Sequence, residues 1–136
     1  SWKLFEALSF GAVSMVMKYL QKPNRKKIAN ALNLPEPAIR SWPHCLSYLR
    51  NLCAHHSRLW NRTFTIKPFI INQYATDLSP NDRVYAQLVV SQIFMRMISP
   101  DSLWPDRLKG LLAEHPKLTL ERLAFPADWQ DRPVWN

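Results

Sequence analysis

The sequence predicts an all-α domain. Apolar residues recur at helical spacing in several segments, as they do within Trp2–Leu20. The 136 residues include only two glycines, Gly11 and Gly110, which leaves little material for the tight hairpin turns of an all-β fold. Eleven prolines mark the boundaries between segments instead. The length is typical of one domain, so we expect residues 1–136 to form a single domain.

Two helices are predicted in the first third of the chain. The amphipathic stretch Trp2–Leu20 is the first, and Pro23 stops it. Asn24 then favours the start of a short basic helix over Arg25–Leu32, and Asn33 ends that helix.

A long helix and an extended segment are predicted next. Residues 37–42 lead to Pro43, which favours the first turn of a helix that runs to about Trp60. The segment 63–71 (TFTIKPFII) is predicted to be extended, with Pro68 arguing against a central strand.

The last third of the chain predicts two full helices and a short one. The first runs from about Arg83 to Ile98 and the second ends near Glu114 after a cap at Pro100-Asp101. Pro116 and Thr119 open the short last helix. The chain thus divides into basic, motif-bearing helices (1–62), an extended or loop segment (63–80), helices (81–123) and an irregular tail rich in Pro and Trp (124–136).

Composition excludes several kinds of site. Two isolated glycines cannot build a phosphate-cradling loop, a dinucleotide fingerprint or a nucleophile elbow. The histidines lack the carboxylate or cysteine partners of a zinc site, so we expect no metal and no cofactor. Cys45 and Cys53 are too far apart on one helix for a disulfide and are predicted to be buried thiols.

The sequence shows neither a signal peptide nor an apolar run of membrane-spanning length. A cytoplasmic protein without a membrane partner is therefore expected. Because the chain begins with Ser1 rather than Met, we expect the C-terminal fragment of a longer protein.

Positive charge gathers in the first half of the chain. The formal net charge is +8, from 18 Lys and Arg against 10 Asp and Glu. Residues 7–76 hold ten basic residues and one acid, Glu36, whereas the remainder is nearly balanced. Such a source of positive charge suits a polyanion such as RNA, although a solvated basic surface explains it equally well. A dense basic run, Lys22, Arg25, Lys26 and Lys27, is a candidate contact for the RNA backbone.

The most specific pattern lies in residues 47–62, SYLRNLCAHHSRLWNR. On a continuous helix, His55, Arg58 and Arg62 fall within about 40° of Asn51 on a polar face. His56 points toward the opposite apolar stripe, and Arg50 lies about 140° from His55.

These residue types suit metal-independent cleavage of RNA, in which the ribose 2′-OH attacks the adjacent phosphate. A histidine can take or give a proton near neutral pH, and arginines bind phosphate and stabilise the charge that develops during attack. A basic face that binds RNA without cleaving it would account for the same charges.

Arg50-Asn51-x-x-x-His55 is similar to the active-site motif of the HEPN-superfamily ribonucleases. The wider block from Arg50 to Arg62 resembles the abortive-infection Abi-D/Abi-F-like family, as do residues 2–20 and the tail from Phe125 to Trp135.

The resemblance implies a HEPN-like helical bundle that dimerises and places two Arg/His motifs across a shared cleft. It implies an endoribonuclease of bacterial phage defence or of a toxin–antitoxin system, restrained by an RNA or protein antitoxin. Arg50 would bind the scissile phosphate, His55 would transfer protons, and Asn51 would orient either the histidine or the phosphate. Arg58 and Arg62 would bind RNA.

A composite site also suits the helix geometry, because one helix cannot easily aim Arg50 and His55 at one atom and a two-fold axis supplies both from each chain. Two other hypotheses stay open: a non-catalytic module that binds RNA or an antitoxin, and a dimerisation module in which the motif only supports structure.

Overall fold

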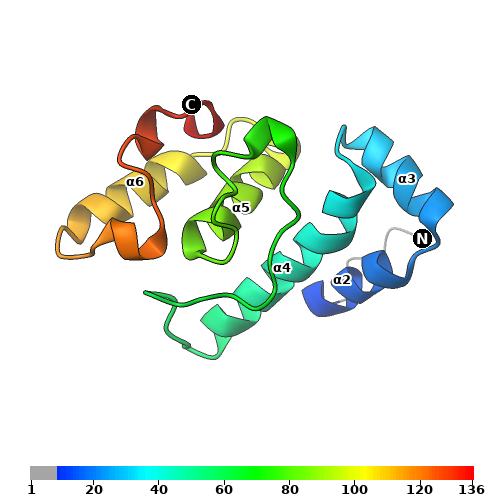
Figure 1. Ribbon diagram of the computed structural model, residues 1–136, viewed down its shortest axis with the longest axis horizontal. Coiled ribbons are helices and arrows are strands. Elements are labelled where there is room, and N and C mark those ends of the chain that lie inside the picture. The colour runs from blue at the N-terminus through cyan, green and yellow to red at the C-terminus, as the bar shows by residue number, and fades with distance from the viewer. Residues whose placement is uncertain (1–8) are drawn as a thin grey trace.

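The computed structural model describes residues 9–136 and contains α-helices and 3-10 helices in that range, without a strand (Figure 1). The predicted all-α class is confirmed. The α-helices are α2 (Phe10–Tyr19), α3 (Lys22–Ala31), α4 (Glu36–Ala54), α5 (Val84–Ile98) and α6 (Trp104–Glu114), and the 3-10 helices are η1 (Asn72–Tyr74), η2 (Leu120–Leu123), η3 (Trp129–Asp131) and η4 (Pro133–Trp135).

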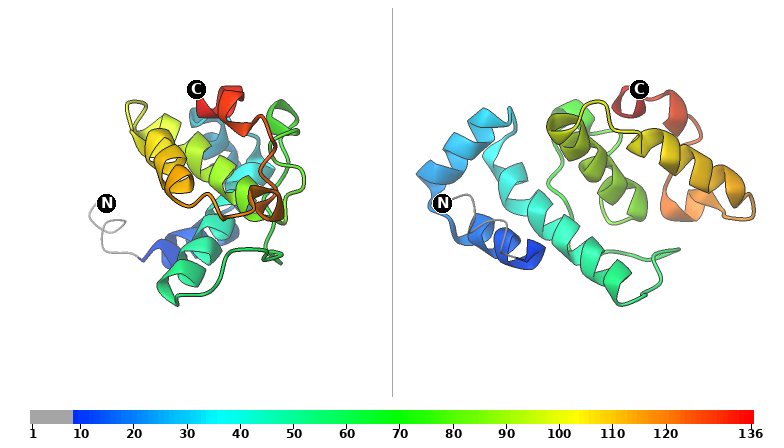
Figure 2. Two further views of the ribbon diagram at one scale, coloured as in Figure 1. Left: turned by 90° about the vertical axis from the view of Figure 1, so that its left-hand side faces the viewer. Right: turned by 180° about the vertical axis from the view of Figure 1, so that it is seen from behind.

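Helix α4 is the centre of the molecule. Helices α2 and α3 pack against it on one side, α5 packs on the other, and α6 lies beyond α5 (Figures 1 and 2). Small residues shape the contact with α2, where Gly11 faces the buried Ser47 and Ser14 is also buried. Because Lys18 lies near the first turns of α4 and Gly11 near its middle, the two helices are antiparallel.

Trp42 of α4 occupies the middle of the core. Its side chain is fully buried, and its ring makes an edge-to-face contact with Phe94 of α5, with centroids 5.7 Å apart. The indole N–H donates to the Phe69 carbonyl at 2.9 Å. The Trp42 side chain therefore holds α4 against α5 and also holds the irregular segment after α4 in place.

Helix α4 begins earlier than predicted. It starts at Glu36 with Pro37 in its first turn, so Pro43 lies inside the helix rather than at its start. An interior proline costs about 3 kcal/mol, because it removes one N–H donor and crowds the preceding turn. The buried residues Ala38, Ile39 and Trp42 offset that cost, since full burial of one large apolar side chain contributes about 1.5–3 kcal/mol.

Helix α4 also ends earlier than the predicted boundary at Trp60. His55 is its C-cap and His56 has a φ of 51°, in the left-handed region. The Ser57 N–H donates to the Leu52 carbonyl at 2.8 Å and the His56 N–H to the Cys53 carbonyl at 3.0 Å, which together form a Schellman motif. The prediction that residues 51–62 share one continuous helix is therefore wrong.

Helix α3 ends in the same way at Asn33, as predicted. It starts at Lys22 with Gln21 as N-cap, so the predicted cap at Asn24 is wrong. Of the first predicted helix, residues 1–8 lie outside the described residues, and the remainder forms α2.

The extended segment 63–71 is not a strand, because it has no partner strand within residues 9–136. Side chains hold it in place instead: Ser41, Gln87 and Asn81 all bond to its backbone. The boundaries predicted near Ile98 and Glu114 are confirmed, and the short last helix is the 3-10 helix η2.

The tail packs on α5 through aromatic residues. The Trp135 indole N–H donates to the Tyr85 hydroxyl at 3.1 Å, and that hydroxyl donates to Asp77 at 3.1 Å. Arg132 pairs with the same Asp77 at 3.0 Å. Burial raises the pKa of Tyr85 to about 12. Trp129 is buried as well, so these tryptophans are core anchors.

In the part of the chain that the structure describes, every helix is too short or too polar to cross a bilayer. Cys45 and Cys53 are both free thiols on α4. Cys45 is buried as predicted, but Cys53 is exposed although Leu52, beside it in the same turn, is buried, so the prediction for Cys53 is wrong.

One testable consequence concerns the ion pair that joins α3 to α4. Arg25 bonds to Glu36, and this hydrogen bond holds the pKa of Glu36 below its ordinary value of 4.5. A depressed folded-state pKa stabilises the protein above the unfolded-state pKa, and this contribution disappears as pH falls through the folded-state pKa. The Tm of wild type should exceed that of Glu36→Gln at pH 7, and the difference should vanish in acid. Thermal unfolding across pH 2–7 measures it.

The matched control is Asp106→Asn, which removes an acid from the first turn of α6 that pairs with no base in the described residues. A Glu36→Gln difference that persists unchanged below the folded-state pKa would contradict the assignment.

A second consequence concerns thiol reactivity. Burial raises the pKa of Cys45 to about 12, so this thiol should stay protonated and unreactive in the folded protein. Titration with a thiol-specific disulfide reagent at pH 8 should modify one thiol quickly, and the second only after unfolding. The Cys53→Ser variant should lose the fast reaction, and rapid modification of this variant would contradict the burial of Cys45.

Candidate functional site

Arg50 and Asn51 lie in the last two turns of α4, and both are exposed. Their side chains meet, because the Arg50 guanidinium donates to the Asn51 side-chain oxygen at 3.2 Å. On the helix the two residues project about 100° apart, so Arg50 bends round toward the Asn51 face. The structure thus brings together two of the three predicted catalytic residues.

His55 caps the end of α4, and its side chain is exposed. Its backbone N–H donates to the Asn51 carbonyl at 3.0 Å, which places it one turn after Asn51. Its imidazole makes no hydrogen bond to Arg50, Asn51 or any other described residue. The ring is therefore free to meet a substrate or a second chain.

His56 is not the inward-facing residue that the helical projection predicts. Its side chain is exposed, because the left-handed turn at this residue redirects the chain away from the helix. Asn, Asp and His are the non-glycine residues most often found in this conformation. The structure therefore gives His56 a role in ending α4.

Arg58 and Arg62 do not share a helix face with His55, because both follow the turn. Arg58 is exposed, and its carbonyl accepts a hydrogen bond from Arg62 at 3.3 Å. Arg62 also lies beside Tyr48, and hydrogen bonds with Arg62 and Thr65 lower the pKa of that phenol. Arg62 therefore returns to α4 at Tyr48, close to the turn that carries Asn51.

The basic run on α3 lies at the other end of α4. Lys22, Lys26 and Lys27 are exposed, whereas Arg25 is committed to Glu36 and to the Leu20 carbonyl. Helix α3 packs beside the first turns of α4 (Figure 1), and 19 residues of α4 span about 28 Å. One chain therefore does not bring this run to the Arg50–His55 motif.

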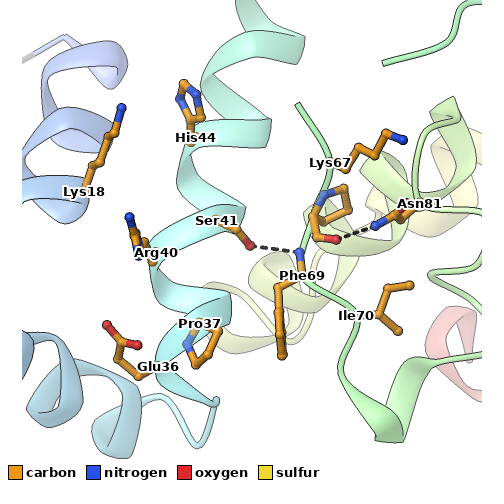
Figure 3. Close-up of a pocket in the computed structure, with 11 residues that line it drawn as sticks. Lys18, Glu36, Pro37, Arg40, Ser41, His44, Lys67, Phe69, Ile70 and Asn81 are labelled. Atoms are coloured by element: carbon orange, nitrogen blue, oxygen red, sulfur yellow. Dashed lines mark hydrogen bonds between the residues drawn. The ribbon is translucent and has the colours of Figure 1, made fainter. Parts of the chain in front are cut away.

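A groove that the sequence did not reveal runs over the first half of α4 (Figure 3). It has a volume of about 670 Å³. Helix α4 forms its floor, Lys18 of α2 lies on one side, and the segment 67–70 lies on the other. We call it the α4 groove; its lining residues are Lys18, Glu36, Pro37, Arg40, Ser41, His44, Lys67, Pro68, Phe69, Ile70 and Asn81.

Spacing gives a signal for part of the groove floor, because Arg40 and His44 line the groove and belong to a longer stripe on α4. Arg40, His44, Tyr48, Asn51 and His55 recur every three or four residues and project within an arc of about 80°. The stripe is visible only if α4 begins at Glu36, and a predicted helix start at Pro43 hides its first member.

The comparison with known families bears on this half of the chain. A sequence model of the Abi-like protein family matches residues 1–61. These residues resemble Abi-like proteins. No curated protein and no solved structure shows significant similarity to the chain.

The Abi-like match includes α2, α3, α4 and the Schellman turn. It therefore contains Arg50, Asn51, His55 and most of the basic excess, and it supports the Abi-like family for this part of the protein. The match does not extend over α5, α6 or the aromatic tail.

Two observations concern the chemical groups of the site. Among residues 9–136, no three His, Cys, Asp or Glu side chains are grouped as metal ligands would be. The exposed groups near the end of α4 are an imidazole, a guanidinium and an amide, which can transfer protons, bind an anion and orient it. This set suits general acid–base chemistry on a phosphate ester.

Proposed function

We propose that this protein is a metal-independent endoribonuclease of a bacterial phage-defence (abortive infection) or toxin–antitoxin system. The Abi-like match suggests the abortive-infection role. The observation that carries the catalytic proposal is the exposed cluster at the end of α4, where Arg50 bonds to Asn51 and His55 follows one turn later. The HEPN assignment is part of the proposal.

The roles follow from the chemistry of each group. Arg50 binds the scissile phosphate and stabilises the charge that builds on it, because a guanidinium offers planar paired donors to phosphate oxygens. His55 accepts the proton of the attacking 2′-OH or gives one to the leaving 5′-oxygen. Asn51 holds Arg50 in position through the 3.2 Å hydrogen bond.

The proposed cleavage step consumes no water molecule. The 2′-oxygen forms a bond to phosphorus, the bond to the 5′-oxygen breaks, and a 2′,3′-cyclic phosphate and a 5′-hydroxyl remain. One histidine takes a proton and another donor returns one, which is simplest when two copies of His55 face one phosphate.

A homodimer would supply that arrangement. The exposed face of α2 carries apolar side chains beside α4, among them Met15, Val16 and Tyr19. Contact of this face with a second chain would remove apolar surface from water, and two Arg50–His55 pairs could then share one cleft. RNA is the proposed substrate, with Arg58, Arg62 and the lysines of α3 as backbone contacts, and an RNA or protein antitoxin is the proposed restraint.

The first test removes the proposed acid–base group. His55→Ala should lower the rate of RNA cleavage by about 10²–10⁴-fold, because general acid–base catalysis contributes about that factor. Cleavage of a labelled RNA in the presence of EDTA measures the rate, and a 2′-deoxy substitution at the cut site should abolish it.

The matched control is His56→Gly, which removes the neighbouring imidazole and keeps the left-handed turn without steric strain. The His56→Gly variant should fold like the wild type and should still cleave RNA. Cleavage by His55→Ala at the wild-type rate would rule out the proposed chemistry. Salt-sensitive RNA binding without turnover, in wild type with and without its antitoxin, would favour the non-catalytic binding module instead.

The second test asks whether the site is shared between chains. Arg50→Ala and His55→Ala should each be inactive as homodimers, but mixed dimers hold one Arg50 and one His55 at the shared cleft. Unfolding and refolding the two variants together should therefore restore part of the activity. The readouts are cleavage rate and mass by light scattering.

Refolded mixtures of His55→Ala with His55→Ala serve as the blank. If the variants form mixed dimers that remain inactive, the shared site is wrong even though His55 is essential. If Arg50→Ala and His55→Ala instead fail to dimerise, the motif has the structural role of a dimerisation module.

A further inference from the structure

The α4 groove lies apart from the proposed cleavage residues. Its floor residues Arg40 and His44 precede His55 by 15 and 11 residues on the same helix, a distance of about 16–22 Å along the axis. The proposed cleavage chemistry uses none of its lining residues. The groove combines an apolar part on one side with positive charge on the other.

The apolar part is held rigidly. The Phe69 N–H donates to Ser41 at 2.9 Å, and the Phe69 carbonyl accepts from the Trp42 indole at 2.9 Å. The Asn81 amide donates to the adjacent Pro68 carbonyl at 2.9 Å. The Phe69 side chain nevertheless remains 42% exposed and lines the groove (Figure 3). An exposed aromatic ring on a fixed backbone is a stacking surface that loses little entropy when a planar ligand binds.

The charged part is largely unpaired. Lys18 and Arg40 form no ion pair with a described residue, and Lys67 approaches Asp82 only at 3.9 Å. The one acid in the lining, Glu36, is engaged by Arg25. Within residues 9–136 the groove therefore presents two cations that form no ion pair, on the side of α2 and across the helix from the Phe69 ring (Figure 3).

We propose that the α4 groove binds single-stranded RNA, with a base against Phe69 and a backbone phosphate at Lys18 and Arg40. An aromatic ring on one side of the groove and two cations on the other match a base and a backbone phosphate of the same strand, and a single strand leaves its bases free to stack. This proposal rests on the proposed function, because it assigns the groove to substrate held upstream or downstream of the cleavage site.

Binding is tested in a His55→Ala background, so that cleavage does not enter the measurement. The probe is a 5′-fluorescein-labelled ten-nucleotide oligouridine, followed by fluorescence anisotropy. Phe69→Ala should weaken binding about tenfold, because one base loses its stacking partner. Arg40→Gln should weaken it about tenfold and reduce the slope of log K against log salt by about one.

The controls are Leu103→Ala and Arg107→Gln, which remove an exposed apolar side chain and an exposed arginine of α6 and its N-cap; α6 lies beyond α5 from α4 (Figure 1). Leu103→Ala should leave the affinity and the salt slope unchanged, and Arg107→Gln should change either one less than Arg40→Gln does. Equal losses from Arg40→Gln and Arg107→Gln would show only a general effect of charge and would overturn the proposal.

A cross-linking experiment locates the contact directly. Oligouridine that contains 5-iodouracil should cross-link on irradiation to the peptide that holds Phe69, and the Phe69→Ala variant should lose that product. A cross-link confined to other peptides would overturn the proposal. Competition by uridine monophosphate distinguishes an RNA strand from a free nucleotide as the ligand. Complete displacement of oligouridine at equal concentrations would assign the groove to a free nucleotide and overturn the RNA assignment.

The outcomes separate this proposal from the nuclease proposal. If Phe69→Ala and Arg40→Gln bind and cleave like wild type while His55→Ala is inactive, the groove assignment is wrong and the nuclease stands. If all three variants cleave like wild type but the two groove variants lose oligouridine affinity, the groove binds RNA and the catalytic assignment of His55 is wrong.

Discussion

The burial of Trp42 is the constraint on which the rest of the structure depends. This side chain joins α4 to α5 through Phe94 and joins α4 to the irregular segment through the Phe69 carbonyl. Truncation of a buried tryptophan typically costs about 3–5 kcal/mol, which is a large part of the roughly 5–15 kcal/mol that stabilises a domain. The core and the wall of the α4 groove therefore share one side chain, and the irregular backbone of that wall is hydrogen-bonded to the helix beside it.

The end of α4 satisfies structural and chemical demands with the same residues. The last turn of a helix carries partial negative charge from its unpaired carbonyls, so a cation placed there is stabilised. Arg50 lies near that end and His55 caps it. Positive charge near a helix C-terminus is favourable even without a substrate, so the proposed catalysis rests on a more specific feature. The specific support is the exposure of an imidazole next to a bonded Arg50–Asn51 pair.

The sequence predicted the helical class and several boundaries because proline and asparagine signals stood at the right places. Asn33 ends α3 through a left-handed residue, and the region after Ile98 ends α5 as expected. Two local features made the predicted start and end of α4 wrong. Pro43 is typical of a helix start, yet the burial of its neighbours outweighs the cost of a proline inside the helix. His56 occupies the left-handed position after the helix, which in most sequences is a glycine or an asparagine and is recognised by that residue.

That second error changed the predicted site more than the fold. A helix continued through His56 places Arg58 and Arg62 beside His55, whereas the turn sends the chain back along α4 and brings Arg62 to Tyr48. The polar stripe from Arg40 to His55 replaces the shorter face that the sequence predicted. No pattern in 63–71 shows that its backbone is held by Ser41 and Trp42, because such contacts depend on how distant segments pack.

A single rigid helix that carries the Arg50–His55 cluster and the floor of the groove has a consequence for specificity. The separation between the two is fixed by the rise of the helix, so a strand held at Phe69 can reach His55 only with a set length of chain between them. Arg58 follows the turn and its side chain is exposed, so it can contact the backbone of a strand without reading its sequence. Selection by length would then come from α4, and general attraction would come from the basic residues around it. The length of α4 would then set the distance between the groove and the cleavage site, and the Schellman turn fixes the residue at which α4 ends.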